Sequence, residues 1–152
     1  MKLDFVKDLY QKGLFGIYEG FDTWQEAVKA STTPLVEKGI VEPAYGDRIL
    51  ENVKENGPYF FIAPHIAMPH ATNGFDLVKE PAVSFVKINK PVYCDAPDSP
   101  DWGSELFFTI AVKEANAHLE TIMKLADLLD DEETVNALVD AKTEEDFKKL
   151  LG

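Results

Sequence analysis

Residues 59–71 read YFFIAPHIAMPHA and hold two of the three histidines in the chain, His65 and His70, each directly after a proline. The aromatic and aliphatic run at 59–62 is typical of a short buried strand. The prolines that follow should end that strand and fix the backbone of a loop at its C-terminal end. Because α/β proteins place their chemistry at the carboxyl ends of strands, a histidine in this loop is a candidate nucleophile or proton carrier.

The composition indicates one compact domain that spans residues 1–152, because 152 residues with 45% hydrophobic side chains can build a core of their own. The net charge of −12 argues against a nucleic acid or an anionic membrane surface as a partner, and leaves room for a basic protein. Cys94 is the single cysteine, so it forms no internal disulfide and no cysteine cluster for zinc. The chain has no apolar run of membrane-spanning length and carries Asp4 where a signal peptide would be apolar, so we expect a cytoplasmic protein.

Four elements are expected before residue 57, from apolar periodicity and from glycine and proline punctuation. They are a helix at 3–10 closed by Gly13, an edge strand at 14–19, a helix capped by Asp22 that Pro34 should break before Gly39, and a helix opened by Glu42 and Pro43 and ended by Gly57.

After the histidine loop, strands are expected at 82–88 and 106–112, with a long irregular loop at 89–104 between them. The second strand is almost continuously apolar, which indicates a sheet covered on both faces. Three helices should follow: one from residue 115 with Asn116 as its cap, one begun by the acids at 130–133, and a terminal helix opened by Thr143 with Asp146. This order predicts an α/β sandwich, a small mixed sheet flanked by helices on both faces.

The third histidine, His118, should lie in the first turn of the helix that follows the strand at 106–112. If that strand neighbours the run at 59–62, His118 and the histidine loop meet at one edge of the sheet. A helix N-terminus there would also offer backbone N–H donors to an anion.

Other interpretations compete with a catalytic one. His65, His70 and His118 could form a three-histidine zinc site, although no nearby carboxylate is evident to orient the ligands. The chain could also be a non-catalytic acidic module that binds proteins through the 89–104 loop.

Three further residues are interpreted as structural. Cys94 lies in the acidic loop, which should not favour a thiolate, so we interpret it as a structural or incidental thiol. We interpret Trp24 and Trp102 as packing residues.

Residues 57–71, together with AHLE at 117–120 and LADLLDD at 125–131, resemble the enzyme IIA component of the bacterial phosphoenolpyruvate-dependent sugar phosphotransferase system. The likeness is to the mannitol and fructose family and, within it, to the ascorbate and galactitol-like branch. It covers nearly the whole chain, and the sequence IAMPH at 66–70 is its most specific part.

The resemblance implies that His70 is the phosphorylated nucleophile and that His118 is the second active-site histidine, which stabilises the phosphoryl group. His70 would then take phosphate from the histidine-containing phosphocarrier protein and pass it to a cysteine of enzyme IIB, which serves the membrane enzyme IIC. The exchange needs no metal and no cofactor. The branch suggests an ascorbate-like or pentitol-like substrate.

The chain also departs from the family pattern. Glycine is expected at position 65, so the His65 ring could crowd the site or supply an auxiliary contact. The arginine of many mannitol-type members is missing, with Asn52 and Asn56 nearby. We further expect Ile66 and Met68 to form an apolar patch for both partners, with a charged rim from Asp95, Asp98 and Asp101 or the acids at 130–133.

Overall fold

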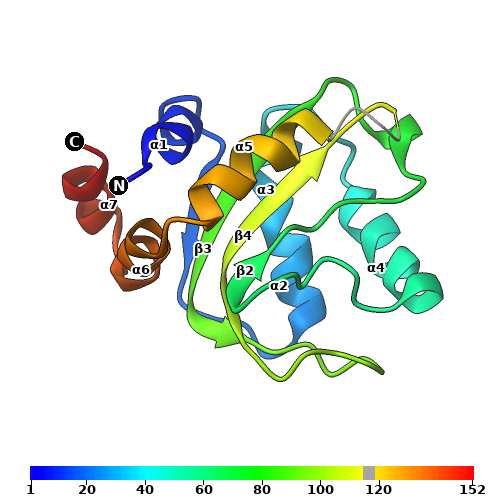
Figure 1. The fold of residues 1–152 in the computed structure, drawn as a ribbon. Coiled ribbons are helices and arrows are strands. Elements are labelled where there is room, and N and C mark those ends of the chain that lie inside the picture. Colours follow the sequence, from blue (N-terminus) through cyan, green and yellow to red (C-terminus); the bar gives the residue numbers. More distant parts are fainter. Residues whose placement is uncertain (115–118) are drawn as a thin grey trace.

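The computed structural model describes residues 1–114 and 119–152. Four strands form one sheet in the order β1-β3-β4-β2 (Figure 1). Their bounds are β1 Phe15–Tyr18, β2 His65–Ala67, β3 Ala82–Val92 and β4 Ser104–Ala111. The central pair β3 and β4 is antiparallel, whereas β1 runs parallel to β3 and β2 runs parallel to β4. The mixed sheet that the sequence predicted is therefore confirmed, with β1 on its expected edge.

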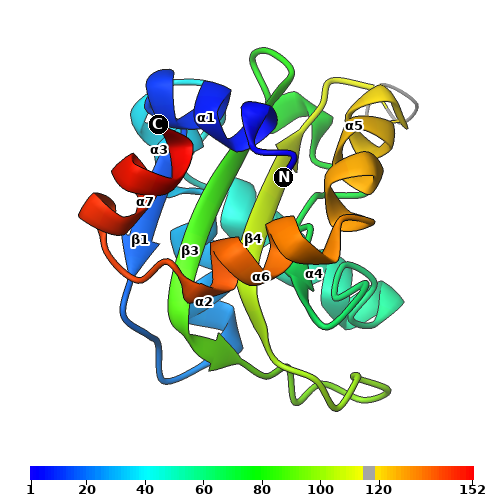
Figure 2. The ribbon, with the colours of Figure 1, turned by 60° about the vertical axis from the view of Figure 1, so that its left-hand side comes forward.

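Helices cover both faces of this sheet, as expected (Figure 2). On one face lie α1 (Asp4–Gln11), α6 (Glu132–Asp140) and α7 (Glu144–Leu151), and on the other lie α2 (Trp24–Ser31), α3 (Thr33–Glu37) and α4 (Tyr45–Asn56). Helix α5 (Leu119–Leu129) leads into α6, and a short 3-10 turn, η1 (Phe75–Leu77), precedes β3.

Every residue of β4 is buried, which is why its sequence shows no alternation between polar and apolar residues. On the α7 face, Phe85 of β3 packs against Phe108 of β4 with ring centroids 4.9 Å apart, and Phe147 of α7 lies against Phe85 at 5.9 Å. On the opposite face, Phe107 packs against Phe61 at 6.5 Å. The two layers of aromatic side chains hold the helices to the sheet.

Most of the predicted helix boundaries are confirmed, including the start of α6 among the acids at 130–133, and two are wrong. The predicted helix breaks at Thr32, with Pro34 in the first turn of α3, Gly57 ends α4, and Thr143 with Asp146 forms a capping box at the start of α7. The cap of α2 is Thr23 rather than Asp22, because the Thr23 side chain accepts from the Glu26 N–H. The start of α4 is also later than predicted: Pro43 lies before its N-cap, Ala44.

The strand predicted at 59–62 is absent, and the short strand β2 lies instead at residues 65–67, inside the predicted loop. Phe60 and Phe61 are both buried, which consecutive residues of a one-faced strand would not be. The segment turns back at Pro64 and covers the outer side of β2: the Met68 N–H donates to the Phe60 carbonyl at 2.9 Å, and Ala63 bridges Ile66.

The loop expected at 89–104 is shorter, because β3 continues through Pro91 to Val92. The pairing with β4 shifts register between Lys87 and Val92, and such an irregularity tolerates a residue without an N–H group. No helix among the described residues is long and apolar enough to cross a bilayer.

Candidate functional site

His70 lies three residues after the end of β2, beside the carboxyl end of β4. The Ile110 N–H of β4 donates to the Pro69 carbonyl at 2.9 Å, so the loop begins as an extension of the sheet. This is the edge where the sequence argument placed a reactive histidine. The residue is half-buried, which leaves part of the ring accessible to another molecule.

The orientation of the His70 ring is set by the backbone two residues earlier. His70 Nδ1 lies 2.7 Å from the Met68 carbonyl oxygen. Because a carbonyl oxygen only accepts, Nδ1 carries the hydrogen, and the lone pair of the neutral ring is at Nε2. The Tyr59 ring stands edge-on to the imidazole, with centroids 5.1 Å apart and planes at 79°. The short loop therefore selects both the tautomer and the rotamer of His70.

Two tyrosines hold the backbone around His70. The Tyr59 hydroxyl donates to the His70 carbonyl oxygen. The Tyr45 hydroxyl donates to the Ile110 carbonyl at 2.8 Å and accepts from the Ala71 N–H at 3.3 Å. Burial raises the pKa of Tyr45 to about 12 and also raises the pKa of Tyr59, so both phenols keep their protons near neutral pH.

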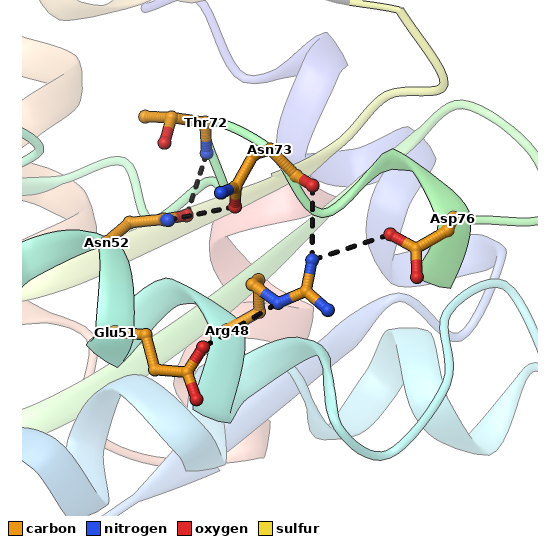
Figure 3. A network of polar contacts seen from close by, with 6 residues as sticks. All are labelled: Arg48, Glu51, Asn52, Thr72, Asn73 and Asp76. Carbon is orange, nitrogen blue, oxygen red and sulfur yellow. Dashed lines mark hydrogen bonds and ion pairs between the residues drawn. The ribbon is translucent and has the colours of Figure 1, made fainter.

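Helix α4 supplies a second set of contacts to the turn after His70 (Figure 3). Asn52 accepts from the Thr72 N–H at 2.9 Å and donates from Nδ2 to the Asn73 side-chain oxygen at 2.9 Å. Arg48 donates to the Asn73 carbonyl at 3.1 Å and pairs with Asp76 at 3.4 Å. We call the three α4 side chains Tyr45, Arg48 and Asn52 the α4 clamp; their spacing of three and then four residues places them on one face of the helix.

His65 occupies the opposite end of β2. Its backbone pairs with Ser104 at the start of β4, whereas the residue before His70 bonds Ile110 near the end of β4. The five residues from His65 to His70 therefore run along the sheet in a nearly extended conformation, which can span about 17 Å. The His65 Nδ1 lies 3.0 Å from a carboxylate oxygen of Glu105, which is 5% exposed. The structure thus does not bring His65 to His70 as an auxiliary group, and it separates two ligands of the three-histidine alternative. Among the described residues, no group of three metal-ligating side chains occurs.

The backbone conformation at position 65 explains why glycine is expected there. His65 has φ of +74°, a left-handed conformation that costs a residue with a Cβ about 1 kcal/mol. Its backbone N–H donates to the Gly103 carbonyl at 3.0 Å, which ties the start of β2 to the end of the loop before β4.

The predicted apolar partner patch is wrong. Ile66 is 3% exposed and Met68 is 4% exposed, so both belong to the core. Residue 66 points inward as part of β2, and the segment at 59–63 covers the strand beyond it. The acidic residues of the loop after β3 also lie at the far end of the sheet, next to the start of β4 rather than next to His70.

The other residues named in the sequence analysis include two tryptophans and the cysteine, which the structure places in the core or in the loop. Trp24 packs in the core and donates from Nε1 to Asp95 at 2.9 Å, and Cys94 is buried, as their structural interpretations required. Trp102 is partly buried in the loop. His118, the predicted partner of His70, and Asn116 lie outside the described residues.

The sequence argument did not assign the clamp residues or the tyrosines to the site. Tyr45 was visible only as a member of a helix and Tyr59 only as part of an apolar run, whereas Asn52 was noted only as lying near the position of the missing arginine. One signal was present: Asn52 falls on the buried side of α4, where a polar side chain requires a partner.

Comparison with known proteins places this arrangement in a family. Residues 8–152 match the family described as "Phosphoenolpyruvate-dependent sugar phosphotransferase system, EIIA 2". The ascorbate-specific PTS system EIIA component of Escherichia coli strain K12 is 38% identical over 131 residues, which is 86% of this chain and 83% of that protein.

Solved structures of phosphotransferase enzymes IIA have a similar fold. The mannitol-specific cryptic phosphotransferase enzyme IIA CmtB from Escherichia coli has a TM-score of 0.78 at 26% identity, covering 96% of this chain and 97% of that one. The mannitol enzyme IIA of Escherichia coli, solved in complex with phosphorylated enzyme IIB, has a TM-score of 0.71 at 28% identity, covering 89% and 92% of the two chains. This chain belongs to the EIIA type 2 family of the phosphotransferase system. Membership implies a phosphotransferase role in sugar uptake.

Proposed function

We propose that this protein is a single-domain cytoplasmic phosphocarrier, spanning residues 1–152, that holds a phosphoryl group on His70 between two other proteins. The observation that carries the proposal is the hydrogen bond from His70 Nδ1 to the Met68 carbonyl, 2.7 Å long. It leaves the nucleophilic lone pair on Nε2, on a half-buried ring at the carboxyl edge of the sheet.

The chemistry consists of two displacements at phosphorus. The Nε2 lone pair forms a new N–P bond while the N–P bond of the phosphocarrier protein breaks and its imidazole leaves. A cysteine thiolate of enzyme IIB then forms an S–P bond, and the electron pair of the His70 N–P bond returns to Nε2. Such transfers need an in-line nucleophile and donors for the equatorial oxygens, and we assign one of these donors to His118 on the family resemblance.

Enzyme IIB is the expected acceptor because the related mannitol enzyme IIA was solved in complex with it. The phosphocarrier protein as donor and the membrane enzyme IIC as the final user complete the proposal. The names of the relatives favour ascorbate as the substrate of the system.

The decisive experiment is phosphorylation in a reconstituted system. With phosphoenolpyruvate, enzyme I and the phosphocarrier protein, the wild-type chain should form an acid-labile, base-stable adduct that peptide mapping assigns to His70. His70→Ala should take up no label, while His65→Ala, at the other end of β2, should label at the wild-type rate. Undiminished labelling of His70→Ala would contradict the assignment.

His118 is tested in the same assay. His118→Ala should slow phosphoryl transfer about 10- to 100-fold, because one charge-stabilising donor is removed from the transition state. The phosphorylated residue should remain His70. Unchanged forward and reverse rates would remove His118 from the site.

The substrate is tested at the second transfer. The phosphorylated chain should pass its phosphate faster to the enzyme IIB of an ascorbate system than to the enzyme IIB of a mannitol system. Equal rates, or a preference for the mannitol protein, would reject ascorbate.

A further inference from the structure

The turn after His70 is held by side chains from a different part of the chain. Tyr59 bonds the His70 carbonyl, Tyr45 bonds the Ala71 N–H, and Asn52 bonds the Thr72 N–H. Successive polar groups of the backbone are thus fixed by side chains rather than by secondary structure. A nucleophile held in this way loses little freedom on reaching the reactive geometry.

Asn52 is a buried member of the α4 clamp. It is 1% exposed, and both ends of its amide are used, with Oδ1 accepting from Thr72 and Nδ2 donating to Asn73. Burying an amide is costly unless it is fully paired, so this residue is retained for its hydrogen bonds rather than for packing. Asn73 is in turn held at its carbonyl by Arg48 (Figure 3).

The turn also has no room to move toward α4. A Cβ placed on Gly74 would lie 2.9 Å from the Ala71 Cβ and 3.1 Å from the Arg48 Cγ. The backbone of residues 71–74 therefore packs directly on the clamp, and a shift of Asn52 or Arg48 is transmitted to the residue that follows His70.

We propose that Asn52 is a positioning residue for phosphoryl transfer: through Thr72 and Asn73 it fixes the turn that orients His70. This inference rests on the proposed function of His70 as phosphoryl acceptor. Asn52 acts through the backbone and contacts neither the ring nor the incoming phosphorus in this role. Its loss should lower the rate constant of transfer at saturating phosphocarrier protein, while the KM for that protein stays nearly constant, because the partner surface is unchanged.

The test compares Asn52→Ala with a matched control, Asn56→Ala, which makes the same change one turn later on the same helix, at an exposed position. In rapid-mixing phosphorylation assays, Asn52→Ala should slow transfer at saturating phosphocarrier protein about 10- to 100-fold with less than a twofold change in KM. Asn56→Ala should behave as wild type. In nitrogen-15 NMR spectra, the His70 Nδ1–H signal of Asn52→Ala should broaden or shift while that of Asn56→Ala does not.

Asn73 provides a second route if Asn52→Ala does not fold. Asn73 is exposed, so Asn73→Ala removes the acceptor of Asn52 without opening the core, and Asn73→Asp restores an acceptor oxygen. Asn73→Ala should slow transfer severalfold, and Asn73→Asp should recover most of the rate. Wild-type rates for Asn52→Ala, or for Asn73→Ala where Asn52→Ala is unfolded, would overturn the inference. If wild type and Asn56→Ala take up no phosphate either, it is the proposed function that fails.

Discussion

At the scale of single residues, His70 and His65 show how the same residue type acquires different roles from its backbone. His70 is held by a carbonyl two residues earlier, which a short loop supplies at 2.7 Å. His65 has a left-handed backbone and lies beside a buried carboxylate. The first arrangement puts the lone pair of the neutral ring on Nε2, and the second places the ring within hydrogen-bonding distance of Glu105.

A paired substitution at position 65 separates the backbone cost from the side-chain contact. Both His65→Ala and His65→Gly remove the imidazole from Glu105, but only glycine adopts φ of +74° without strain. His65→Gly should therefore be more stable than His65→Ala by about 1 kcal/mol in urea unfolding. Equal stabilities, or a more stable alanine variant, would show that the position tolerates a Cβ at no cost.

At the scale of elements, α6 is joined to the sheet by a buried cation. Lys87 of β3 is 0% exposed and donates from Nζ to the Val139 carbonyl at 2.9 Å, the Ala141 carbonyl at 2.6 Å and the Asn89 side chain at 3.0 Å. It thus caps the last turn of α6, where a positive charge also meets the negative end of the helix dipole. Burial lowers the pKa of Lys87 to about 8, with Lys142 adding to the effect.

The lowered pKa of Lys87 predicts a particular pH dependence of stability. Between pH 8 and about 10.4, the value of an unfolded lysine, the unfolded chain holds the Lys87 proton and the folded chain releases it. The free energy of unfolding should therefore rise with pH across this window, by up to about 1.4 kcal/mol per pH unit from this group. Urea unfolding of wild type and Lys87→Met at pH 7.5, 8.5 and 9.5 isolates the contribution, because the other groups titrate in both proteins. A constant difference between the two proteins over this range would contradict the lowered pKa.

The sequence predicted elements well where local rules decided them. Pro34, Gly57 and the Thr143 capping box act within one turn of the chain, and their effects were confirmed. The continuous apolar run of β4 also revealed a strand buried on both faces. The fold class followed from the order of these elements.

Predictions failed where a contact distant in sequence decided the outcome. The run at 59–62 has strand composition, yet β4 pairs with residues 65–67 and leaves 59–63 to fold back over them. Ile66 and Met68 became core residues for the same reason. The clamp could not be predicted because α4 and the turn at 71–74 meet only in the folded chain.

At the scale of the whole molecule, the net charge of −12 affects partner proteins mainly through its long-range electrostatic potential. The acids of the loop after β3 lie at the opposite end of the sheet from His70, so they form no contact rim around the histidine. Charges at such distances influence how often partners meet and contribute little to the bound complex.

Phosphate uptake should therefore depend on salt chiefly at low ionic strength. The rate from the phosphocarrier protein should fall between about 10 mM and 150 mM salt and change little beyond, because the Debye length shrinks from about 30 Å to 8 Å over that range. An excess of enzyme IIB should inhibit uptake competitively, since both partners must reach the same histidine. A salt-independent rate would reject the long-range electrostatic argument, and a stable complex of all three proteins would reject the shared surface.

The segment at residues 60–63, which folds back over β2, affects how fast those partner proteins dissociate. An uncovered edge strand of a sheet can form main-chain hydrogen bonds with an extended peptide of another protein. A complex held by such a ladder of hydrogen bonds is specific and dissociates slowly. Here the Phe60 carbonyl already accepts a hydrogen bond from the Met68 N–H, and Ala63 forms a β-bridge with Ile66. The outer edge of β2, just before His70, is therefore occupied by the chain itself. A partner protein that reaches His70 therefore cannot add a strand at this edge, which favours the rapid dissociation that a carrier needs within one catalytic cycle.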